Sequence, residues 1–329
     1  MLRRFLGVIV VVLLILVFAT KQDAQFENPF TDAVIRHVGV IVRDVDKAAI
    51  EYADLLGLPV PDTNEFTGVP FPENYQGDRS AHPKGTNFHL NNLSIELLEP
   101  IGGKSPWRDH LEQFGEGLHH IAFGVKDIQA AVAYLESKGG EYVLGAPDYP
   151  AAYVDLKSLM GFTAELNQIS SDSPVQVVSS QEGTNFGSNP ISHVGIFVPD
   201  VEKSAQHFGA IMGIDIPTAN AYTGLQFPPD FEGDPQAHPK IISFNLKGNS
   251  VSVEFAEPQG GKSPWRDHLE QFGPSMHHIA FGINGMSDHV TYLEEKGGKL
   301  VLGGSGGVGY AFIDLKPEPL GFSIELTGQ

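Results

Sequence analysis

The chain has no cysteine among its 329 residues. It therefore has no disulfide bond, no thiolate metal site and no cysteine nucleophile, and histidine and carboxylate side chains are the metal ligands that remain. Basic residues are scarce too, with 21 Lys and Arg against 40 Asp and Glu and a net charge of −19. An acidic chain without a basic stripe argues against nucleic acid and against anionic membrane surfaces as partners.

One apolar run, residues 5–19, is fifteen residues long and follows Arg3 and Arg4. It is shorter than the roughly 20 residues of a full span, but basic residues before an apolar segment are typical of a secretory signal. Because no convincing cleavage pattern follows, we predict a signal-anchor, an N-terminal hydrophobic helix within residues 1–30, with the domains on the extracytoplasmic (periplasmic or secreted) side. A cleaved signal peptide is the alternative.

The segment GGKSPWRDHLEQFG occurs twice without change, at residues 102–115 and 260–273, and HHIAFG follows each copy. A chance match of this length is negligible, so the chain is a tandem duplication of a domain-sized unit. We predict a first domain at 31–169, a Ser-, Gly- and Asn-rich linker at 170–189 and a second domain at 190–329.

The hydrophobic pattern of each repeat indicates two βαβββ units. A strand from Ile35 is followed by an amphipathic helix over 45–55, a polar stretch and further strands. Ser105 and Pro106 are typical of an N-cap and a first helical position. Strand, helix and three strands then return, so we predict an α+β fold of four βαβββ units with the helices to one side.

Two histidines and two glutamates recur at matching positions. Successive side chains of a strand point to opposite faces, so only one of His119 and His120, and only one of Glu96 and Glu99, can join a shared site. Internal symmetry favours His120, which precedes IAFG as His37 precedes VGVI. The two predicted sets are His37, Glu96, His120 and Glu165, and His193, Glu254, His278 and Glu325.

Such a set suits one divalent metal per domain. Two neutral imidazoles and two carboxylates neutralise the ion, and these ligands suit Zn, Ni, Co, Mn or Fe(II). A lone His or Glu on a strand is more often structural, but eight positions that match in two copies favour metal ligands. We assign His119 and His277 to hydrogen-bonded or surface positions beside the ligands.

These motifs resemble the vicinal oxygen chelate superfamily of glyoxalases, bleomycin-resistance proteins and extradiol dioxygenases. The resemblance is carried by the HVGV start, the ELLEP strand, the segment GGKSPWRDHLEQFGEGLHHIAF and the terminal AEL or IEL, and it covers nearly all of residues 35–328. Within the superfamily the motifs are most similar to methylmalonyl-CoA epimerase. The resemblance implies sheets curled into a cup around one divalent ion, with positions open for two neighbouring substrate oxygens.

The resemblance also implies a reaction: proton transfer on a small substrate chelated through vicinal oxygens, as an isomerase or lyase. By family analogy Glu165 and Glu325 act as the base. Two alternatives remain open, an extradiol-type dioxygenase with Fe(II) and a non-catalytic binding module. The second glutamate of each set counts against the first alternative, and the complete ligand set counts against the second.

Four further residues are candidates for substrate contact. His82 and His238 lie in the string AHPK at the end of a long loop, and such loops often form lids over a cup. Arg108 and Arg266, in the identical segment, suit an anionic substrate.

The same loop departs from the epimerase pattern. That family has a second catalytic glutamate here, whereas Glu65 and Glu73 of the first repeat correspond to Ala221 and Pro229 in the second. Either the second repeat lacks this acid or a two-base mechanism does not apply. Coenzyme A thioesters are cytosolic, which is a further objection to the epimerase reaction. Cups in this family form within or between chains, so the sequence leaves a homodimer open.

Overall fold

The structure is a computed structural model, and it describes residues 28–31, 33–169, 185–246, 251–304, 309–316 and 320–328. The predicted signal-anchor lies almost wholly in residues 1–27, outside the described residues, and so does most of the predicted linker. Among the described residues, no helix combines the length and apolar character needed to cross a membrane.

The first half of the chain forms β1 (Val34–Ile41), α1 (Val45–Leu56), β2 (Asn64–Glu65), β3 (His82–His89), β4 (Ser94–Ile101), α2 (Pro106–Phe114), β5 (Gly117–Val125), α3 (Ile128–Ser137), β6 (Glu141–Leu144), β7 (Ala151–Asp155), α4 (Lys157–Met160) and β8 (Thr163–Gln168). After the 3-10 helix η1 (Phe186–Ser188), the second half forms β9 (Ile191–Phe197), α5 (Val201–Met212), β10 (Asn220–Ala221), β11 (His238–Asn245), β12 (Ser252–Gln259), α6 (Pro264–Phe272), β13 (Ser275–Ile283), α7 (Met286–Glu295), β14 (Lys299–Gly303), β15 (Tyr310–Asp314) and β16 (Ser323–Gly328).

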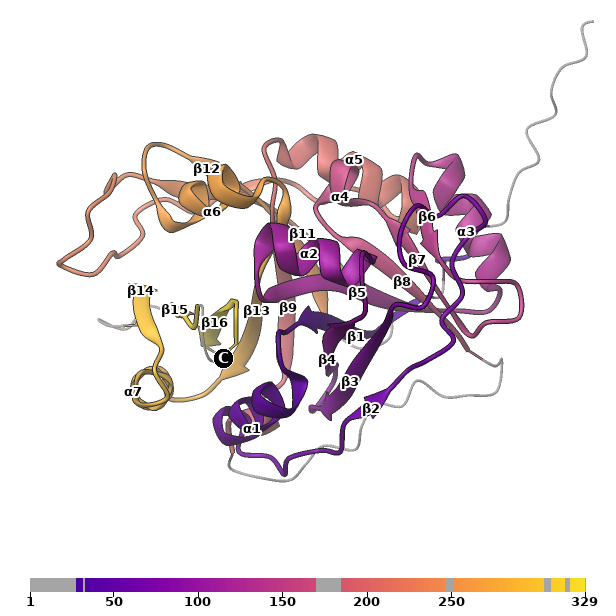
Figure 1. The fold of residues 1–329 in the computed structure, drawn as a ribbon. Coiled ribbons are helices and arrows are strands. Elements are labelled where there is room, and N and C mark those ends of the chain that lie inside the picture. The colour runs from indigo at the N-terminus through magenta and orange to yellow at the C-terminus, as the bar shows by residue number, and fades with distance from the viewer. Residues whose placement is uncertain are drawn as a thin grey trace, which may run out of the picture.

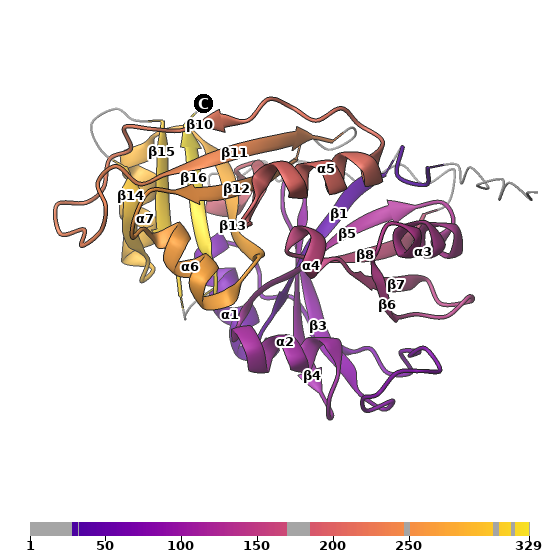
Figure 2. The same cartoon turned by 90° about the horizontal axis from the view of Figure 1, so that it is seen from above.

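Each half builds one curled eight-stranded sheet, and the two sheets lie side by side (Figures 1 and 2). The strand orders are β2-β3-β4-β1-β5-β8-β7-β6 and β10-β11-β12-β9-β13-β16-β15-β14. The two units of a half join where β1 pairs with β5, or β9 with β13. The prediction of four βαβββ units is therefore confirmed, and each cup forms within a single chain.

The helices α1 and α3 cover the outer face of the first sheet. Asp44 caps α1 by accepting from Lys47 N, and Gly57 ends the helix in the left-handed region. The helix α2 differs from the prediction that all helices lie to one side. Its Trp107 packs in a separate cluster with Leu98 and Tyr153, which belong to the inner face of the sheet. The helix α2, and its equivalent α6 in the second domain, therefore each close one side of a cup.

The two domains pack through reciprocal contacts. Tyr134 of α3 donates to Ala210 O at the end of α5 (3.0 Å), and Tyr292 of α7 donates to Leu55 O at the end of α1 (2.8 Å). One apolar core cluster contains residues of both domains. Matching contacts made in both directions give the molecule a pseudo-two-fold arrangement.

Candidate metal centres

The eight predicted ligands come together in two groups, one in each cup. In both groups the four ligand atoms lie within 4.8 Å of one another. Four neighbouring strands contribute one ligand each: β4, β1, β5 and β8 in the first domain, and β12, β9, β13 and β16 in the second. The groups are His37, Glu96, His120 and Glu165, and His193, Glu254, His278 and Glu325.

The distances in the first group fit a shared ion. His37 Nε2 lies 3.2 Å from His120 Nε2 and 3.0 Å from Glu165 Oε2. Glu165 Oε2 is also 2.9 Å from His120 Nε2, and Glu96 Oε2 is 3.4 Å from each imidazole. Two ligands bound at about 2.1 Å and at right angles to each other lie about 3.0 Å apart, so this donor set matches a first-row divalent metal.

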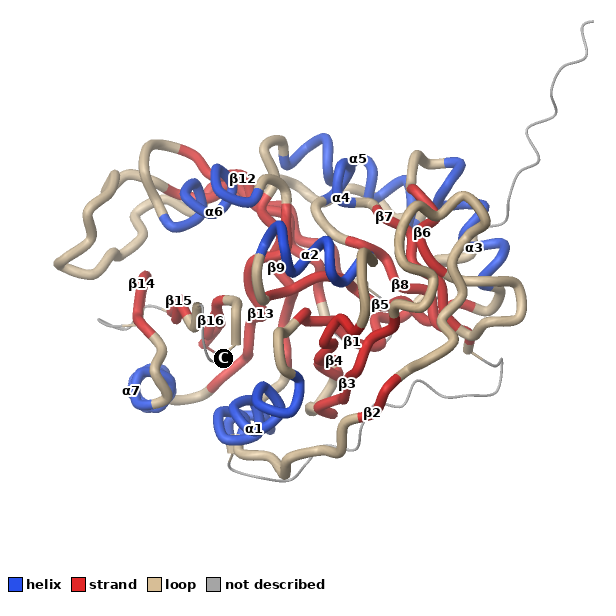
Figure 3. The backbone as a smooth tube through the Cα atoms, in the orientation of Figure 1, coloured by secondary structure: helices blue, strands red, loops and turns tan. Residues whose placement is uncertain are grey.

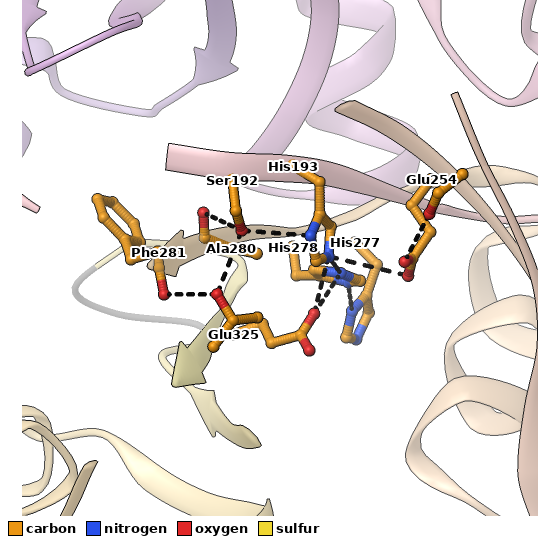
Figure 4. Close-up of polar contacts among 10 residues, drawn as sticks. Ser192, His193, Glu254, His277, His278, Ala280, Phe281 and Glu325 are labelled. Atoms are coloured by element: carbon orange, nitrogen blue, oxygen red, sulfur yellow. Dashed lines mark hydrogen bonds and ion pairs between the residues drawn. The ribbon is translucent and has the colours of Figure 1, made fainter. Parts of the chain in front are cut away.

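The second group is similar but more open at one glutamate (Figure 4). His193 Nε2 lies 3.2 Å from His278 Nε2 and 2.9 Å from Glu325 Oε2. Glu254 stands further off, with Oε1 3.8 Å from His193 Nε2, and its other oxygen accepts from Ser243 Oγ at 3.1 Å. The fourth ligand of this group is therefore held partly by a protein hydroxyl.

The glycine of each HVGV-type start is required by the ligand on the neighbouring strand. Gly39 pairs with His120 across β1 and β5, and a Cβ at Gly39 would lie 1.8 Å from Cε1 of that imidazole. A Cβ at Gly195 would lie 1.9 Å from Cε1 of His278. These distances are far below van der Waals contact, so the missing side chain leaves the space that the ligand imidazole fills.

A β-bulge modifies the expected alternation at the histidine pair. Leu118 and His120 pair with consecutive residues of β1, so His119 has no partner there. A bulge of this kind redirects side chains locally. His119 does not belong to the group of four candidate ligands, but its Nδ1 lies 3.1 Å from His120 Nδ1. The same contact, also 3.1 Å, joins His277 to His278, so both residues are hydrogen-bonded neighbours of a ligand.

Charges within each group shift the pKa values strongly. Burial lowers the pKa of His37, but the carboxylates of Glu96 and Glu165 outweigh it and raise this pKa to about 10. In the second group burial again lowers the pKa of His193, but the carboxylates of Glu254 and Glu325 outweigh it and raise this pKa to about 9. Burial favours the neutral form of Glu325, yet the histidines lower its pKa to about 2. A divalent cation would supply the positive charge that imidazole protons otherwise provide.

The first domain has a phenol where the second has a phenyl ring. Tyr153 of β7 is the cross-strand neighbour of Glu165, and Phe312 of β15 is the neighbour of Glu325. Burial and the nearby carboxylates raise the pKa of Tyr153 well above its usual value, so its hydroxyl stays protonated. Sequence reasoning missed this residue, although aligning AAYVDL with YAFIDL shows the difference.

Two more residues order the first group. Trp107 Nε1 donates to the hydroxyl of Tyr153 at 3.4 Å, and the rings of Tyr153 and His120 lie 5.1 Å apart. Asn167 Nδ2 donates to Glu165 Oε1 at 2.8 Å. This carboxylate therefore has one oxygen held by an amide and the other directed at the histidines. Asn167 was also not predicted.

The predicted substrate histidines lie outside both groups. His82 Nδ1 donates to Ser80 O at 3.0 Å, and His238 Nδ1 donates to Gln236 O at 2.9 Å. His82 Nε2 also lies 3.3 Å from Glu65 Oε2. These contacts lie at the ends of two equivalent long loops, one that joins α1 to β3 (Figure 3) and one that joins α5 to β11. A substrate contact at these histidines stays a prediction.

The predicted arginines make backbone contacts. Arg108 Nη2 donates to Pro100 O at 2.5 Å. Arg266 Nη2 donates to Pro258 O at 2.9 Å, and its Nε donates to Gly261 O at 3.2 Å. Each arginine thus links the start of its helix to the preceding strand. This contact is a structural reason for the segment to be identical in the two repeats. Their role toward an anionic substrate stays a prediction.

A family model described as the Glyoxalase/Bleomycin resistance protein/Dioxygenase superfamily matches residues 36–178 and 192–312. The chain belongs to this superfamily. The resemblance predicted from the motifs is therefore confirmed, together with the tandem arrangement of two domains.

Relatives in this superfamily include epimerases. The mitochondrial methylmalonyl-CoA epimerase of Mus musculus is 33% identical over 141 residues, which cover 41% of this chain and 72% of the relative. The ethylmalonyl-CoA/methylmalonyl-CoA epimerase of Cereibacter sphaeroides is 34% identical over 143 residues, covering 41% of this chain and 97% of the relative. Among solved structures, a mutant of 4-hydroxymandelate synthase from Streptomyces coelicolor aligns with a TM-score of 0.58 and 14% identity, over 90% of this chain and 92% of that one. That last likeness shows the fold alone.

Proposed function

We propose that the protein is a divalent-metal-dependent enzyme that transfers a proton next to a carbonyl group of a small substrate, as an isomerase or lyase. The supporting observation is the pair of cups, in each of which two imidazoles and two carboxylates converge within 4.8 Å. Similarity to epimerases over the length of one domain supports the same class of reaction. Zn, Ni, Co, Mn and Fe(II) all suit these ligands.

The carboxylate of Glu165 is the proposed base of the first domain, and that of Glu325 is the base of the second. An ion bound in either cup supplies Lewis acidity toward substrate oxygens, which favours removal of a neighbouring proton. Although burial opposes ionisation, the histidines lower the pKa of both glutamates. Each is therefore ionised at neutral pH, the form that accepts a proton.

Tyr153 gives the first domain a proton donor beside this base. Because Trp107 donates to the oxygen of the phenol, the phenol's own proton is free for Glu165 or for a substrate oxygen. Phe312 offers no such donor. We therefore assign the faster proton transfer to the first domain. Glu65 and Glu73 are outside both metal groups, so this proposal uses one carboxylate base and a phenol in place of two carboxylates.

The test combines metal content with solvent-deuterium exchange. Protein reconstituted with each candidate metal is incubated in D2O with α-hydroxycarbonyl compounds and with methylmalonyl thioesters, and NMR follows deuterium at the α-carbon. We expect two equivalents of metal and an exchange that requires them. The double variant His120→Ala, His278→Ala is expected to lose both.

Glu99→Gln is the matched control. Glu99 lies on the same strand as Glu96 but accepts from Val45 N at 3.0 Å, at the start of α1 on the outer face. This variant should keep its metal and its exchange. Wild-type protein that binds no metal after reconstitution would overturn the proposal. Bound iron with oxygen uptake on catechols would replace it with the dioxygenase reaction.

We also propose that the protein is membrane-anchored and extracytoplasmic, on the basis of residues 1–30 alone. Fractionation of cells that express the full chain tests this, with a variant lacking residues 5–19 as the control. Recovery of both proteins in the cytoplasm would contradict it, and would restore coenzyme A thioesters as substrates to examine.

A further inference from the structure

A cavity of about 630 Å3 lies between the two domains and is lined by residues of both α2 and α6. None of the eight metal ligands lines it. Its wall carries equivalent residues from each domain, which is the consequence of the pseudo-two-fold arrangement. Three such pairs are His110 and His268, His119 and His277, and Lys157 and Lys316.

Polar atoms of the cavity wall are left without partners. Both ring nitrogens of His110, and Nε2 of His119, are buried and have no hydrogen-bond partner among the described residues. The two side chains are only 6% and 2% exposed. Buried polar groups in folded proteins are almost always hydrogen-bonded, so these nitrogens indicate a ligand of the cavity.

The tautomers make ring nitrogens of His119 and His277 hydrogen-bond donors, a step that rests on the proposed metal centres. A histidine that binds an ion through Nε2 carries its proton on Nδ1. His120 Nδ1 therefore donates to His119 Nδ1, which leaves the proton of His119 on Nε2. The same reasoning through His278 places a proton on Nε2 of His277. Two N–H groups, one from each domain, then belong to residues that line the cavity.

A lysine in the wall adds positive charge. Lys316 Nζ lies 3.4 Å from His268 Nδ1 and 6.0 Å from the ring centroid of Phe272. Among the described residues, no carboxylate lies within ion-pair distance of it. Its counterpart Lys157 differs, because Asp155 Oδ2 lies 3.2 Å from its Nζ. The available cation is therefore on the second-domain side.

The acidic residues of the wall are hydrogen-bonded or exposed, and none of them forms an ion pair with Lys316. Glu116 accepts a backbone N–H from Arg43 at 2.7 Å, and Asp314 accepts from Ser323 Oγ at 3.2 Å. Asp267 is exposed. Apolar rings form much of the remaining wall, and the centroids of Phe114 and Phe272 lie 6.4 Å apart across the domain boundary. Apolar walls with a few polar groups are typical of small-molecule sites, and the volume is within their usual range.

We propose that this inter-domain cavity is a second small-molecule site, which binds one aromatic carboxylate per chain. The rings of Phe114 and Phe272 suit the aromatic part. Lys316 and the N–H groups of His119 and His277 suit the carboxylate, because charge-assisted hydrogen bonds are the strong ones. The site is separate from the metal cups, and it touches both ligand histidines through their neighbours.

The test is titration calorimetry with 2-naphthoate, and with its uncharged amide as the comparison. We expect one equivalent of naphthoate per chain, and binding of the amide at least about tenfold weaker. Lys316→Met is expected to weaken naphthoate at least tenfold. Lys157→Met should have a smaller effect, because Asp155 already engages that charge. Lys262→Met, at an exposed lysine of the same domain, is the control and should leave affinity unchanged.

Other outcomes separate this inference from the proposed function. Two equivalents per chain, or binding that is lost on metal removal but unchanged in Lys316→Met, would place naphthoate in the cups and overturn the inference. Equal affinity of the Lys316 and Lys262 variants would overturn it too, provided that both unfold at the wild-type temperature. One equivalent that depends on Lys316 in a protein that never binds metal would support the cavity while the metal proposal fails.

Discussion

The two metal groups share their ligands and differ in the residues around the carboxylates. In the first domain Asn167 donates to Glu165 Oε1 at 2.8 Å, whereas Thr327, its counterpart, donates to the backbone oxygen of Phe281. In the second domain Ser243 donates to Glu254. The duplication has thus preserved what binds an ion and varied what positions the glutamates.

Other features of the two cups are likewise either present in both or present in only one. Both retain the glycine that makes room for the ligand imidazole and the bulge that brings a second histidine behind it. Only the first has a phenol, Tyr153, where the second has Phe312. Residues needed for ion binding are therefore duplicated, and residues suited to proton transfer are concentrated in the first domain.

Loss of a ligand histidine should have the largest effect. His120→Ala is expected to remove one equivalent of metal and to slow deuterium exchange by roughly tenfold or more, down to the rate of the second domain. His278→Ala should remove the other equivalent and leave most of the exchange, because Tyr153 lies in the first domain. Metal analysis and exchange rates measured on the same samples decide this. Equal loss of exchange in both variants would show that the domains act together.

Alanine in place of Gly39 or Gly195 should have the next largest effect. In Gly39→Ala the new Cβ would lie 1.8 Å from the His120 ring, so the imidazole must move. We expect metal affinity in that domain to fall by roughly 10- to 100-fold, with a loss of about 1–3 kcal/mol in the free energy of unfolding from overpacking. Gly195→Ala should do the same in the second domain.

Gly309→Ala is the control for the glycine variants, since a Cβ there meets no atom within 4 Å. Competition with a chelator measures the affinity, and thermal unfolding measures the stability. Wild-type affinity in Gly39→Ala would mean that His120 binds no ion.

The substitutions Tyr153→Phe and Phe312→Tyr should have a smaller effect on the rate of deuterium exchange. Tyr153→Phe is expected to slow exchange by roughly tenfold or more through kcat, with metal content unchanged, because the ligands are intact. Phe312→Tyr should raise the exchange of the second domain, measured in the His120→Ala background. An unchanged rate in Tyr153→Phe would remove the phenol from the mechanism and leave the two domains chemically equivalent.

Internal duplication is the reason why the sequence predicts so much of the site. Comparison of His120 with His37, between the two units of one repeat, selects His120 over His119, and the second repeat gives the same choice at His278. Strand alternation alone separates Glu96 from Glu99, and the structure places Glu99 on the outer face at the start of α1. The order of strands and helices follows equally from local pattern.

What the sequence does not predict depends on contacts between distant elements. The bulge that brings His119 back beside His120 is a property of two paired strands. Tyr153 matters because β7 pairs with β8 beside Glu165, and no motif marks it. The cavity arises where α2 approaches α6 across the domain boundary. Local periodicity carries no signal for that packing.

The smallest predicted difference between the domains concerns protons. With no ion bound, His37 has a pKa of about 10 and His193 one of about 9, so both imidazoles are protonated at pH 7.5. An incoming metal must displace these protons. Metal affinity should therefore rise with pH, by up to about tenfold per unit, and level off at a lower pH in the second domain than in the first.

The single variants His278→Ala and His120→Ala isolate the first and the second group for this measurement, and calorimetry in two buffers counts the protons released.

The pH dependence of the stability of the metal-free protein follows from the same pKa values. Because folding raises the pKa of His37 above 6.5, its contribution to metal-free stability is complete below pH 6.5 and is lost as the pH rises through about 10. Folding lowers the pKa of Glu325 to about 2, so its contribution is complete above its ordinary value near 4.5 and is lost in acid. Metal-free protein should therefore be most stable between these limits. Metal binding without proton release at pH 7.5 would show that the imidazoles are already neutral, and would remove this electrostatic difference between the domains.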